Sequence, residues 1–195
     1  MTSTLLSRPV DISRYAVVYA SGGKNLGPAG VCVAIVRDDV LASPAHPHLP
    51  SVLDYRKMAS SQPIPNIYNT PPTFLIYMMD LVLQWVEQRG GLDAMEKRAI
   101  KLSSHVYDKV DASNGFYTNH VHKPHRSRMN VPFRIQDGNE ALEKKFVAAA
   151  DQEGLLQLCG HPLFGGIRVT LYNGVPDRAV ERVLDFMQRF RAQHQ

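Results

Sequence analysis

The sequence is poor in cysteine and lacks any long apolar run. Of its 195 residues only Cys32 and Cys159 are cysteines, and they form no C-x-x-C pair. This spacing excludes a disulfide framework and a zinc knuckle and favours a reducing compartment, so we expect a cytoplasmic protein. No stretch approaches the roughly 20 apolar residues of a membrane helix, and the first residues lack the apolar centre of a signal peptide. We therefore expect no membrane partner.

The sequence also lacks a strong excess of charge of either sign. The formal net charge is +4, with 21% charged and 44% hydrophobic residues, which is ordinary for a globular protein. A mildly basic chain suits anionic small molecules as well as nucleic acid, so net charge leaves both open. The basic cluster at residues 120–128 has little aromatic interleaving, which argues against single-stranded nucleic acid as a partner.

Apolar patterning in the first half predicts strands followed by helices. Residues 15–21 and 29–37 read as two buried strands joined by a loop of small residues. A short helix capped by Asp38 is expected next, then a proline-rich loop with a second short helix over 51–59. Two longer helices follow, one after Pro72 and one over residues 92–111. Their expected inward faces are Phe74, Met78, Leu81 and Trp85, and Met95, Ala99, Leu102 and Val106.

The second half predicts a compact β-α-β-α arrangement. Residues 115–135 read as strand, basic turn and strand, and a helix over 139–154 ends at Gly154. Short strands with glycine-rich turns follow, and then a terminal amphipathic helix with Val180, Val183, Met187 and Phe190 inward. An α/β sandwich is the simplest assembly, and we place the domain boundary between residues 95 and 96.

The stretch "YASGGKNLGPAG" sets Lys24 among small residues. A phosphate-binding Walker loop is rejected because Asn25, not serine or threonine, follows the lysine. A dinucleotide fingerprint also fails, since no G-x-G-x-x-G opens a helix here. A lysine that bonds covalently to a flat cofactor fits better, because Gly22 and Gly23 leave room beside the amine. A plain loop with a solvated lysine remains the alternative.

Two further motifs carry possible anion contacts. In "YNTPPTF", Asn69 and Thr70 precede a proline-started helix, where amides and the helix dipole can hold a phosphate. The alternative is helix capping by Thr70. In "GHPLFGGIR", Arg168 follows a double-glycine turn and can make a forked contact with a carboxylate, the alternative being an exposed strand arginine.

Histidines 120 and 122 alternate in sequence and raise the question of a metal. If the segment is extended, both rings lie on one face, but no third ligand has convincing spacing. A solvated basic face is the favoured interpretation, and we predict no metal site.

In this order, several stretches resemble the phosphoserine aminotransferases, a family of fold-type-I pyridoxal phosphate enzymes. The matching segments are "LLSRPVDISRY", "GGKNLGPAGV", "PSVLDY", "YNTPPTF", "HRSRMNVPFRI" and "GHPLFGGIRVTLYN", spread over nearly the whole chain. The resemblance implies an α/β fold that corresponds to the C-terminal half of the family. Residues 1–95 would be the end of the large mixed-sheet domain that binds the cofactor, and residues 96–195 the small α/β sandwich domain.

The resemblance also implies residue roles. Lys24 would bond covalently to pyridoxal phosphate and move a proton during catalysis. Asn69 and Thr70 would hold the cofactor phosphate of the neighbouring subunit in a homodimer. Arg168 would bind the substrate α-carboxylate, and His161 would help to hold the substrate phosphate or the glutamate side chain. The implied reaction is ping-pong amino transfer between glutamate and 3-phosphohydroxypyruvate, giving phosphoserine and 2-oxoglutarate in L-serine biosynthesis.

The sequence departs from the family in ways that bear on activity. Gly23 stands where the family usually has glutamine, and Pro162, which cannot make a bidentate contact, stands where it usually has arginine. Family segments that would precede Met1, among them an aspartate that pairs with the pyridine nitrogen, have no match here. We therefore expect the chain alone to bind pyridoxal phosphate weakly and to turn over little. The alternative is a non-catalytic truncated remnant that binds a full-length partner at the dimer surface.

Overall fold

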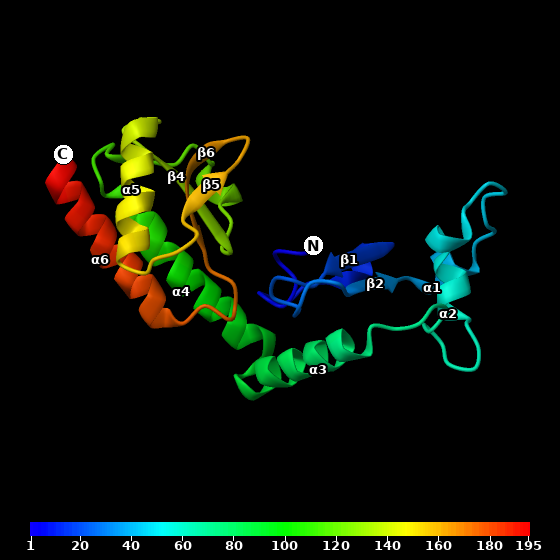
Figure 1. Cartoon of the computed structure of the whole chain (residues 1–195). Coiled ribbons are helices and arrows are strands. Elements are labelled where there is room, and N and C mark those ends of the chain that lie inside the picture. The colour runs from blue at the N-terminus through cyan, green and yellow to red at the C-terminus, as the bar shows by residue number, and fades with distance from the viewer. The chain divides into compact units, whose positions relative to one another are not determined.

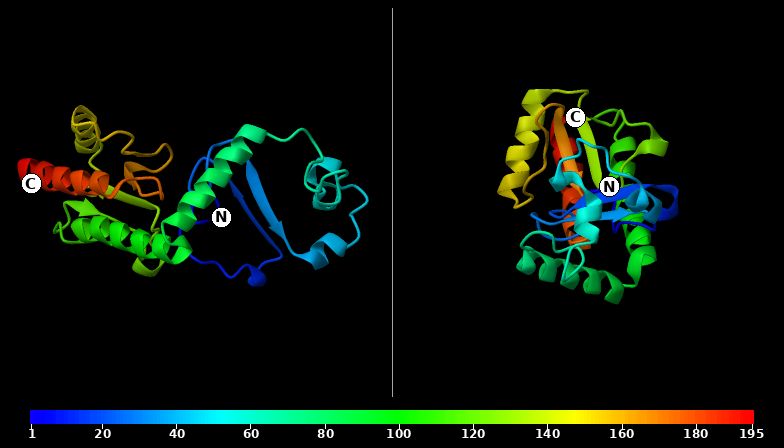
Figure 2. Two further views of the ribbon diagram at one scale, coloured as in Figure 1. Left: turned by 90° about the horizontal axis from the view of Figure 1, so that it is seen from below. Right: turned by 90° about the vertical axis from the view of Figure 1, so that its right-hand side faces the viewer.

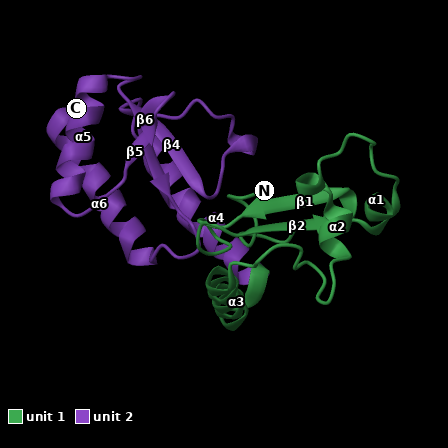
Figure 3. Ribbon diagram, turned by 45° about the vertical axis from the view of Figure 1, so that its right-hand side comes forward, with its two compact units in different colours: residues 1–92 green, residues 93–195 purple.

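The computed structural model describes all residues, 1–195, and divides them into two compact units. Residues 1–92 form the first unit and residues 93–195 the second (Figures 1 and 3). None of the helices combines the length and the apolarity needed to cross a bilayer.

The first unit is built on one antiparallel pair of strands. Strands β1 (Val17–Ser21) and β2 (Cys32–Val36) run side by side from Val17 opposite Val36 to Ser21 opposite Cys32 (Figure 2). The expectation of two buried strands is wrong, because β1 alternates between buried and exposed residues and β2 has no buried residue. Two strands alone offer too little surface to enclose a sheet on both faces.

Helix η1 (Ile12–Arg14) precedes the strand pair. The short helices α1 (Asp38–Ala42), η2 (Ser51–Leu53) and α2 (Tyr55–Ala59) connect the pair to one long helix, α3 (Thr73–Gln88). Asp38 does not cap α1 as expected. It is the first helical residue, and the cap position is held by Arg37, which has no capping side-chain bond. Instead, Asp54 caps α2 by accepting a hydrogen bond from the Arg56 N–H.

Helix α3 lies where the sequence predicts it, but its expected inward face is not buried. Val86 is the only buried residue of the helix, and Phe74 is 69% exposed. A helical spacing of apolar residues specifies a face, whereas burial of that face requires a surface to pack on. Within residues 1–92 that surface is small.

The second unit is a two-layer α/β sandwich. Its helices are α4 (Gly91–Asp111), η3 (Lys123–His125), α5 (Glu140–Gln152) and α6 (Asp177–His194), and its strands are β3 (Tyr117–Thr118), β4 (Asn130–Ile135), β5 (Cys159–His161) and β6 (Gly165–Thr170). The strands form an antiparallel sheet in the order β3-β4-β6-β5. The α/β fold class is therefore confirmed.

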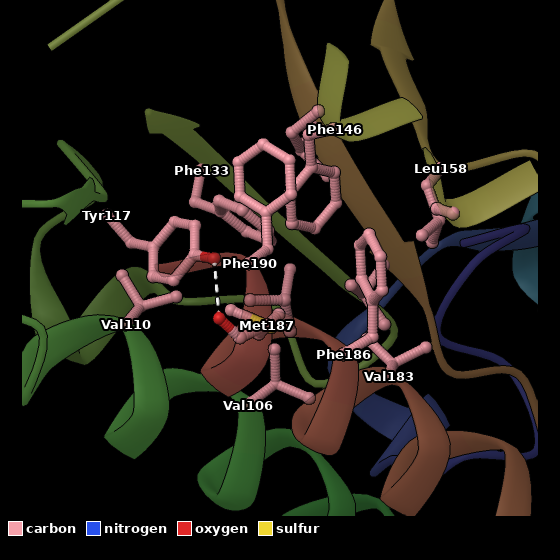
Figure 4. Packing of buried hydrophobic residues seen from close by; sticks show 14 of the residues in the cluster. Val106, Val110, Tyr117, Phe133, Phe146, Leu158, Val183, Phe186, Met187 and Phe190 are labelled. Carbon is pink, nitrogen blue, oxygen red and sulfur yellow. Dashed lines mark hydrogen bonds between the residues drawn. The ribbon is translucent and has the colours of Figure 1, made fainter. Parts of the chain in front are cut away.

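One face of this sheet packs on the helices. Phe133 and Ile167 lie opposite each other in β4 and β6, and both are buried. The fully buried ring of Phe146 in α5 packs edge-on against Phe133 and against Phe186 of α6 (Figure 4). The inward faces expected for α4 and α6 are all buried. The buried faces of α4 and α6 were thus correctly predicted from helical periodicity.

The ends of α5 show how local sequence sets the helix. Asn139 accepts a hydrogen bond from the Leu142 N–H at 3.1 Å, which satisfies one of the free amides of the first turn. At the other end Gly154 has a φ of +75°, and the Leu155 N–H donates to the Ala150 carbonyl. This is a Schellman termination, with the predicted glycine one residue beyond the cap residue, Glu153.

Candidate active site

The lysine loop, residues 22–31, joins β1 to β2. The Gly22 N–H donates to the Val31 carbonyl at 2.7 Å, and the Gly23 N–H donates to the Gly27 carbonyl. A Cβ atom on Gly22 would lie 1.9 Å from the Pro28 carbonyl oxygen, and Gly23 has a φ of +86°. The loop backbone itself therefore requires these glycines, in addition to any room that they leave for a ligand.

Lys24 is exposed on this loop. Its Nζ donates to the Ser3 hydroxyl oxygen at 2.7 Å. The next residue, Asn25, is buried, and its amide donates to the carbonyls of Ser3 and Leu5 at 3.2 Å each. The segment before β1 is thereby fastened to the loop, and a hydroxyl oriented by that segment holds the amine.

Asn69 and Thr70 line a different space from Lys24. Both are exposed and border a cavity of about 300 Å³ together with Cys32 and Ile76. Lys24 does not line this cavity. Thr70 does not cap α3 either, because the cap position is Pro72 and no side chain bonds to it. The capping alternative for Thr70 is therefore wrong, and its hydroxyl stays available at the cavity.

His161 and Arg168 come together in the second unit. Both line a cavity of about 410 Å³ on the side of the sheet opposite to the core. The register places Arg168 of β6 opposite Pro132 of β4. A Cβ atom on Gly166 would come within 2.8 Å of the Phe133 carbonyl oxygen, so the double glycine lets the β5–β6 hairpin lie close to β4.

The guanidinium of Arg168 carries an unsatisfied donor. Its Nε is buried and has no hydrogen-bond partner, and the same holds for the Thr118 hydroxyl in this cavity. An unpaired buried donor costs about 1–3 kcal/mol, so a group that accepts a hydrogen bond there would be stabilised. Arg134, which also borders the cavity, is instead paired with Glu143 at 2.7 Å, and this hydrogen bond raises the pKa of Arg134.

The His161 ring is oriented by the hairpin. Its Nδ1 accepts a hydrogen bond from the Leu163 N–H at 3.1 Å. Because Nδ1 uses its lone pair in this bond, the ring proton is assigned to Nε2, which is then a donor. Pro162 does not line the Arg168 cavity. It borders an adjoining groove of about 690 Å³ beside α5, which shares Arg134 and Phe164 with the Arg168 cavity.

The sequence analysis did not predict two residues of the Arg168 cavity as ligands of an anion. Thr118 lies opposite Arg134 in the β3–β4 pair, and His120 follows two residues later along the cavity. Alternation along a strand was the available signal, since residues two apart share a face. It could not be used before the pairing of β3 with β4 was known.

The comparisons with known proteins agree with the resemblance seen in the sequence. The chain is 47% identical over 191 residues to a phosphoserine aminotransferase of Geobacillus kaustophilus, covering 98% of this chain and 51% of that protein. The phosphoserine aminotransferase structure from Bacillus circulans subsp. alkalophilus superposes with a TM-score of 0.93 at 44% identity, over 100% of this chain and 52% of that one. A PLP-bound phosphoserine aminotransferase from Trichomonas vaginalis gives 0.89 at 38% identity, over 96% and 52%.

The matches all cover a similar share of the related proteins. The chain spans about half the length of the curated relatives that it matches. The family profile described as Aminotransferase class-V matches residues 1–173, which is most of the chain. The chain therefore belongs to the class-V aminotransferase family.

Proposed function

We propose that this chain is part of a phosphoserine aminotransferase, which exchanges an amino group between glutamate and 3-phosphohydroxypyruvate to give phosphoserine and 2-oxoglutarate. The observation that carries the proposal is the unsatisfied Arg168 Nε beside His161 in one cavity. Substrates with a carboxylate at one end and a second anionic group supply the acceptors that such a cavity lacks. The relatives named above support the same reaction class.

The residues of the first unit fit pyridoxal phosphate as the cofactor. When bound, this cofactor supplies an electron-accepting ring that stabilises negative charge on the substrate α-carbon. The Lys24 amine is exposed and held by a hydroxyl, so it would hold the cofactor through Nζ and carry a proton at that atom. Asn69 and Thr70 would hold the phosphate through their amide and hydroxyl groups.

Substrate binding falls to the second unit. The planar Arg168 guanidinium would take the α-carboxylate in a forked contact. His161 would donate from Nε2 to the phosphate or to the second carboxylate. In this proposal residues 1–95 belong to the cofactor-binding domain and residues 96–195 form the small domain.

We place this enzyme in the cytoplasm, in L-serine biosynthesis, and as a homodimer. Asn69 and Thr70 border a cavity that Lys24 does not line, although all three belong to the first unit. In one chain, Lys24 therefore faces a different space from Asn69 and Thr70, although all three would serve the same kind of cofactor. A homodimer accounts for this if Asn69 and Thr70 complete the site of a neighbouring copy.

A reduction experiment tests the proposal. The purified chain is mixed with pyridoxal phosphate and reduced with borohydride, and the modified peptide is mapped by mass spectrometry. We expect labelling selective for Lys24 but below one equivalent, and no label at this position in Lys24→Arg, which keeps the charge. Labelling spread evenly over many lysines would contradict the assignment of Lys24.

A second measurement tests the substrate side. Arg168→Lys keeps the positive charge but loses the fork, and we expect it to weaken phosphoserine binding about tenfold. Arg178→Lys, on the exposed side of α6, is the matched control and should bind as the wild type does. Equal affinities in all three proteins would remove Arg168 from the site.

The alternative of a non-catalytic partner-binding chain is favoured by one observation. Large hydrophobic side chains are exposed over much of the first unit, and α3 alone exposes Phe74, Ile76, Tyr77, Leu81 and Leu83. Extended exposed apolar surface is typical of an interaction site. Mixing the chain with a full-length relative and measuring the masses by light scattering would reveal a mixed dimer.

A further inference from the structure

The face of the sheet opposite to the core places several polar side chains at one cavity. Arg168 of β6 lies opposite Pro132 of β4, and Arg134, two residues further along β4, lies opposite Thr118 of β3. His120 follows Thr118 by two residues and borders the same cavity of about 410 Å³. His120 and Arg168 therefore reach one space from segments far apart in the sequence.

The other basic groups at this cavity are committed elsewhere. Arg134 forms a two-bond pair with Glu143, at 2.7 and 3.2 Å. His161 accepts the Leu163 N–H on Nδ1, so it contributes a neutral N–H donor. This leaves Arg168 as the permanent charge and His120 as the group able to add a second one.

His120 is held only loosely where it lies. Its Nε2 is 3.3 Å from the Asp137 Oδ1 in the turn between β4 and α5, and the two side chains are 72% and 77% exposed. Exposed ion pairs of this kind are weak, because water screens both partners. The imidazole can therefore exchange Asp137 for an anion in the cavity without a large loss.

We propose that His120 is a specificity-determining residue of the Arg168 cavity, where its protonated ring favours a doubly charged anion over a singly charged carboxylate. This rests on the proposed function, in that it assigns the phosphate-bearing substrate to this cavity. The charged and titratable groups facing His120 are Asp137 from the β4–α5 turn and, through the cavity, Arg134, His161 and Arg168.

The sign of the pH dependence follows from the imidazole. Protonation gives an imidazole ring a positive charge, and a lower pH favours the protonated ring. A dianion should then bind more tightly at low pH. A singly charged carboxylate gains less from a second cation, since Arg168 already matches its charge.

Inorganic sulfate is the probe, because it stays a dianion from about pH 5.5 to 8, whereas a phosphate monoester takes up a proton near pH 6. The binding of sulfate and of formate to the full 195-residue chain is measured by calorimetry at about pH 5.5 and at about pH 8. We expect sulfate to bind about tenfold more tightly at the lower pH, and formate to change less than about twofold.

Variants assign the effect to one ring. His120→Gln should reduce the sulfate pH ratio from about tenfold to about twofold. His122→Gln is the matched control, since His122 is an exposed histidine of the same loop that does not line the cavity. Arg168→Gln should weaken sulfate binding at both pH values.

A His120→Gln protein that keeps the wild-type pH ratio would overturn the inference, as would a wild-type affinity that does not change with pH. Circular dichroism of each variant verifies the fold, and substitution of an exposed side chain such as His120 should not disturb it. The binding assay contains no cofactor. Failure of Lys24 labelling would therefore count against the proposed function alone, and a lost His120 effect against this inference alone.

Discussion

Gly22 and Lys24 have different roles in the same loop: the glycine permits the backbone conformation, and the lysine carries the reactive amine. Gly22 is required because the Pro28 carbonyl occupies the position of a side chain, and Gly23 because its backbone is left-handed. Lys24 needs neither condition, and its amine donates a hydrogen bond to the Ser3 hydroxyl oxygen. The chemistry of the amine therefore depends on neighbours that carry no chemistry themselves.

We expect Gly22→Ala to disturb this loop. Its Cβ would meet the Pro28 oxygen at 1.9 Å, which backbone atoms cannot relieve without moving. Borohydride labelling of Lys24 should fall severalfold relative to the wild type. Gly174→Ala, where nothing lies within 4 Å of the added atom, is the control and should label normally. Undiminished labelling of Gly22→Ala would show that the loop tolerates the displacement.

Asp111 contributes to stability in a pH-dependent way. Both its carboxylate oxygens accept hydrogen bonds from Arg126, at 2.8 and 2.9 Å, and these bonds hold the pKa of Asp111 below its ordinary value of 3.8. A lowered folded-state pKa means that the stabilisation is complete above that ordinary value and is lost as the pH falls through the folded-state value. Arg126 also lies 4.7 Å from the Tyr107 ring centre.

Urea denaturation between about pH 6 and pH 2 tests this pair. The wild-type free energy of unfolding should fall more steeply toward acid than that of Arg126→Gln, since the variant lacks the bonds that lower the Asp111 pKa. Parallel curves for the two proteins would show that the pair contributes nothing to acid sensitivity.

At the scale of elements, α3 and α4 differ in what they find to pack on. Both carry apolar residues at helical spacing, yet α3 buries only Val86 while α4 buries Met95, Ala99, Leu102 and Val106 among others. Helix α4 meets a four-stranded sheet and two other helices in its unit (Figure 4). Periodicity thus marks a face that can be buried, and its partners decide whether it is.

Helix α5 depends on its first turn. Asn139→Ala removes the acceptor for the Leu142 N–H and should lower the free energy of unfolding by about 1 kcal/mol, measured by urea denaturation. Asn139→Asp keeps an acceptor and should retain most of the stability. If the alanine and aspartate variants were equally destabilised, loss of the capping bond would not be the cause.

At the scale of the whole molecule, the two units differ in their cores. The hydrophobic cluster runs from Leu102 to Phe190 and lies entirely within the second unit. In the first unit only Val18, Ala20, Leu26 and Val86 are buried hydrophobic residues. The core of the first unit is too small to offset, by itself, the conformational entropy lost on ordering 92 residues.

We therefore expect residues 93–195 alone to fold and to melt cooperatively. Residues 1–92 alone should associate through the exposed edges of β1 and β2 and show no sharp melt. Calorimetry and sedimentation of the two fragments check this. A monomeric first unit with a cooperative transition would show that its few buried residues suffice.

The sequence alone determined the features that depend on neighbours in the chain. The inward faces of α4 and α6, the glycine after α5 and the loop around Lys24 were all recognisable, because helical spacing and turn chemistry are local properties. The resemblance to phosphoserine aminotransferases was recognisable for the same reason, since it rests on short contiguous motifs.

Only the tertiary structure decided which faces are covered and which side chains share a space. It left α3 largely exposed, kept Asn69 and Thr70 at a cavity apart from Lys24, and brought Thr118 and His120 to Arg168. The physical reason is that burial and cavities arise from pairing between distant segments. Strand register, such as Arg168 opposite Pro132, is set by the packing of whole faces and is not contained in any one stretch of sequence.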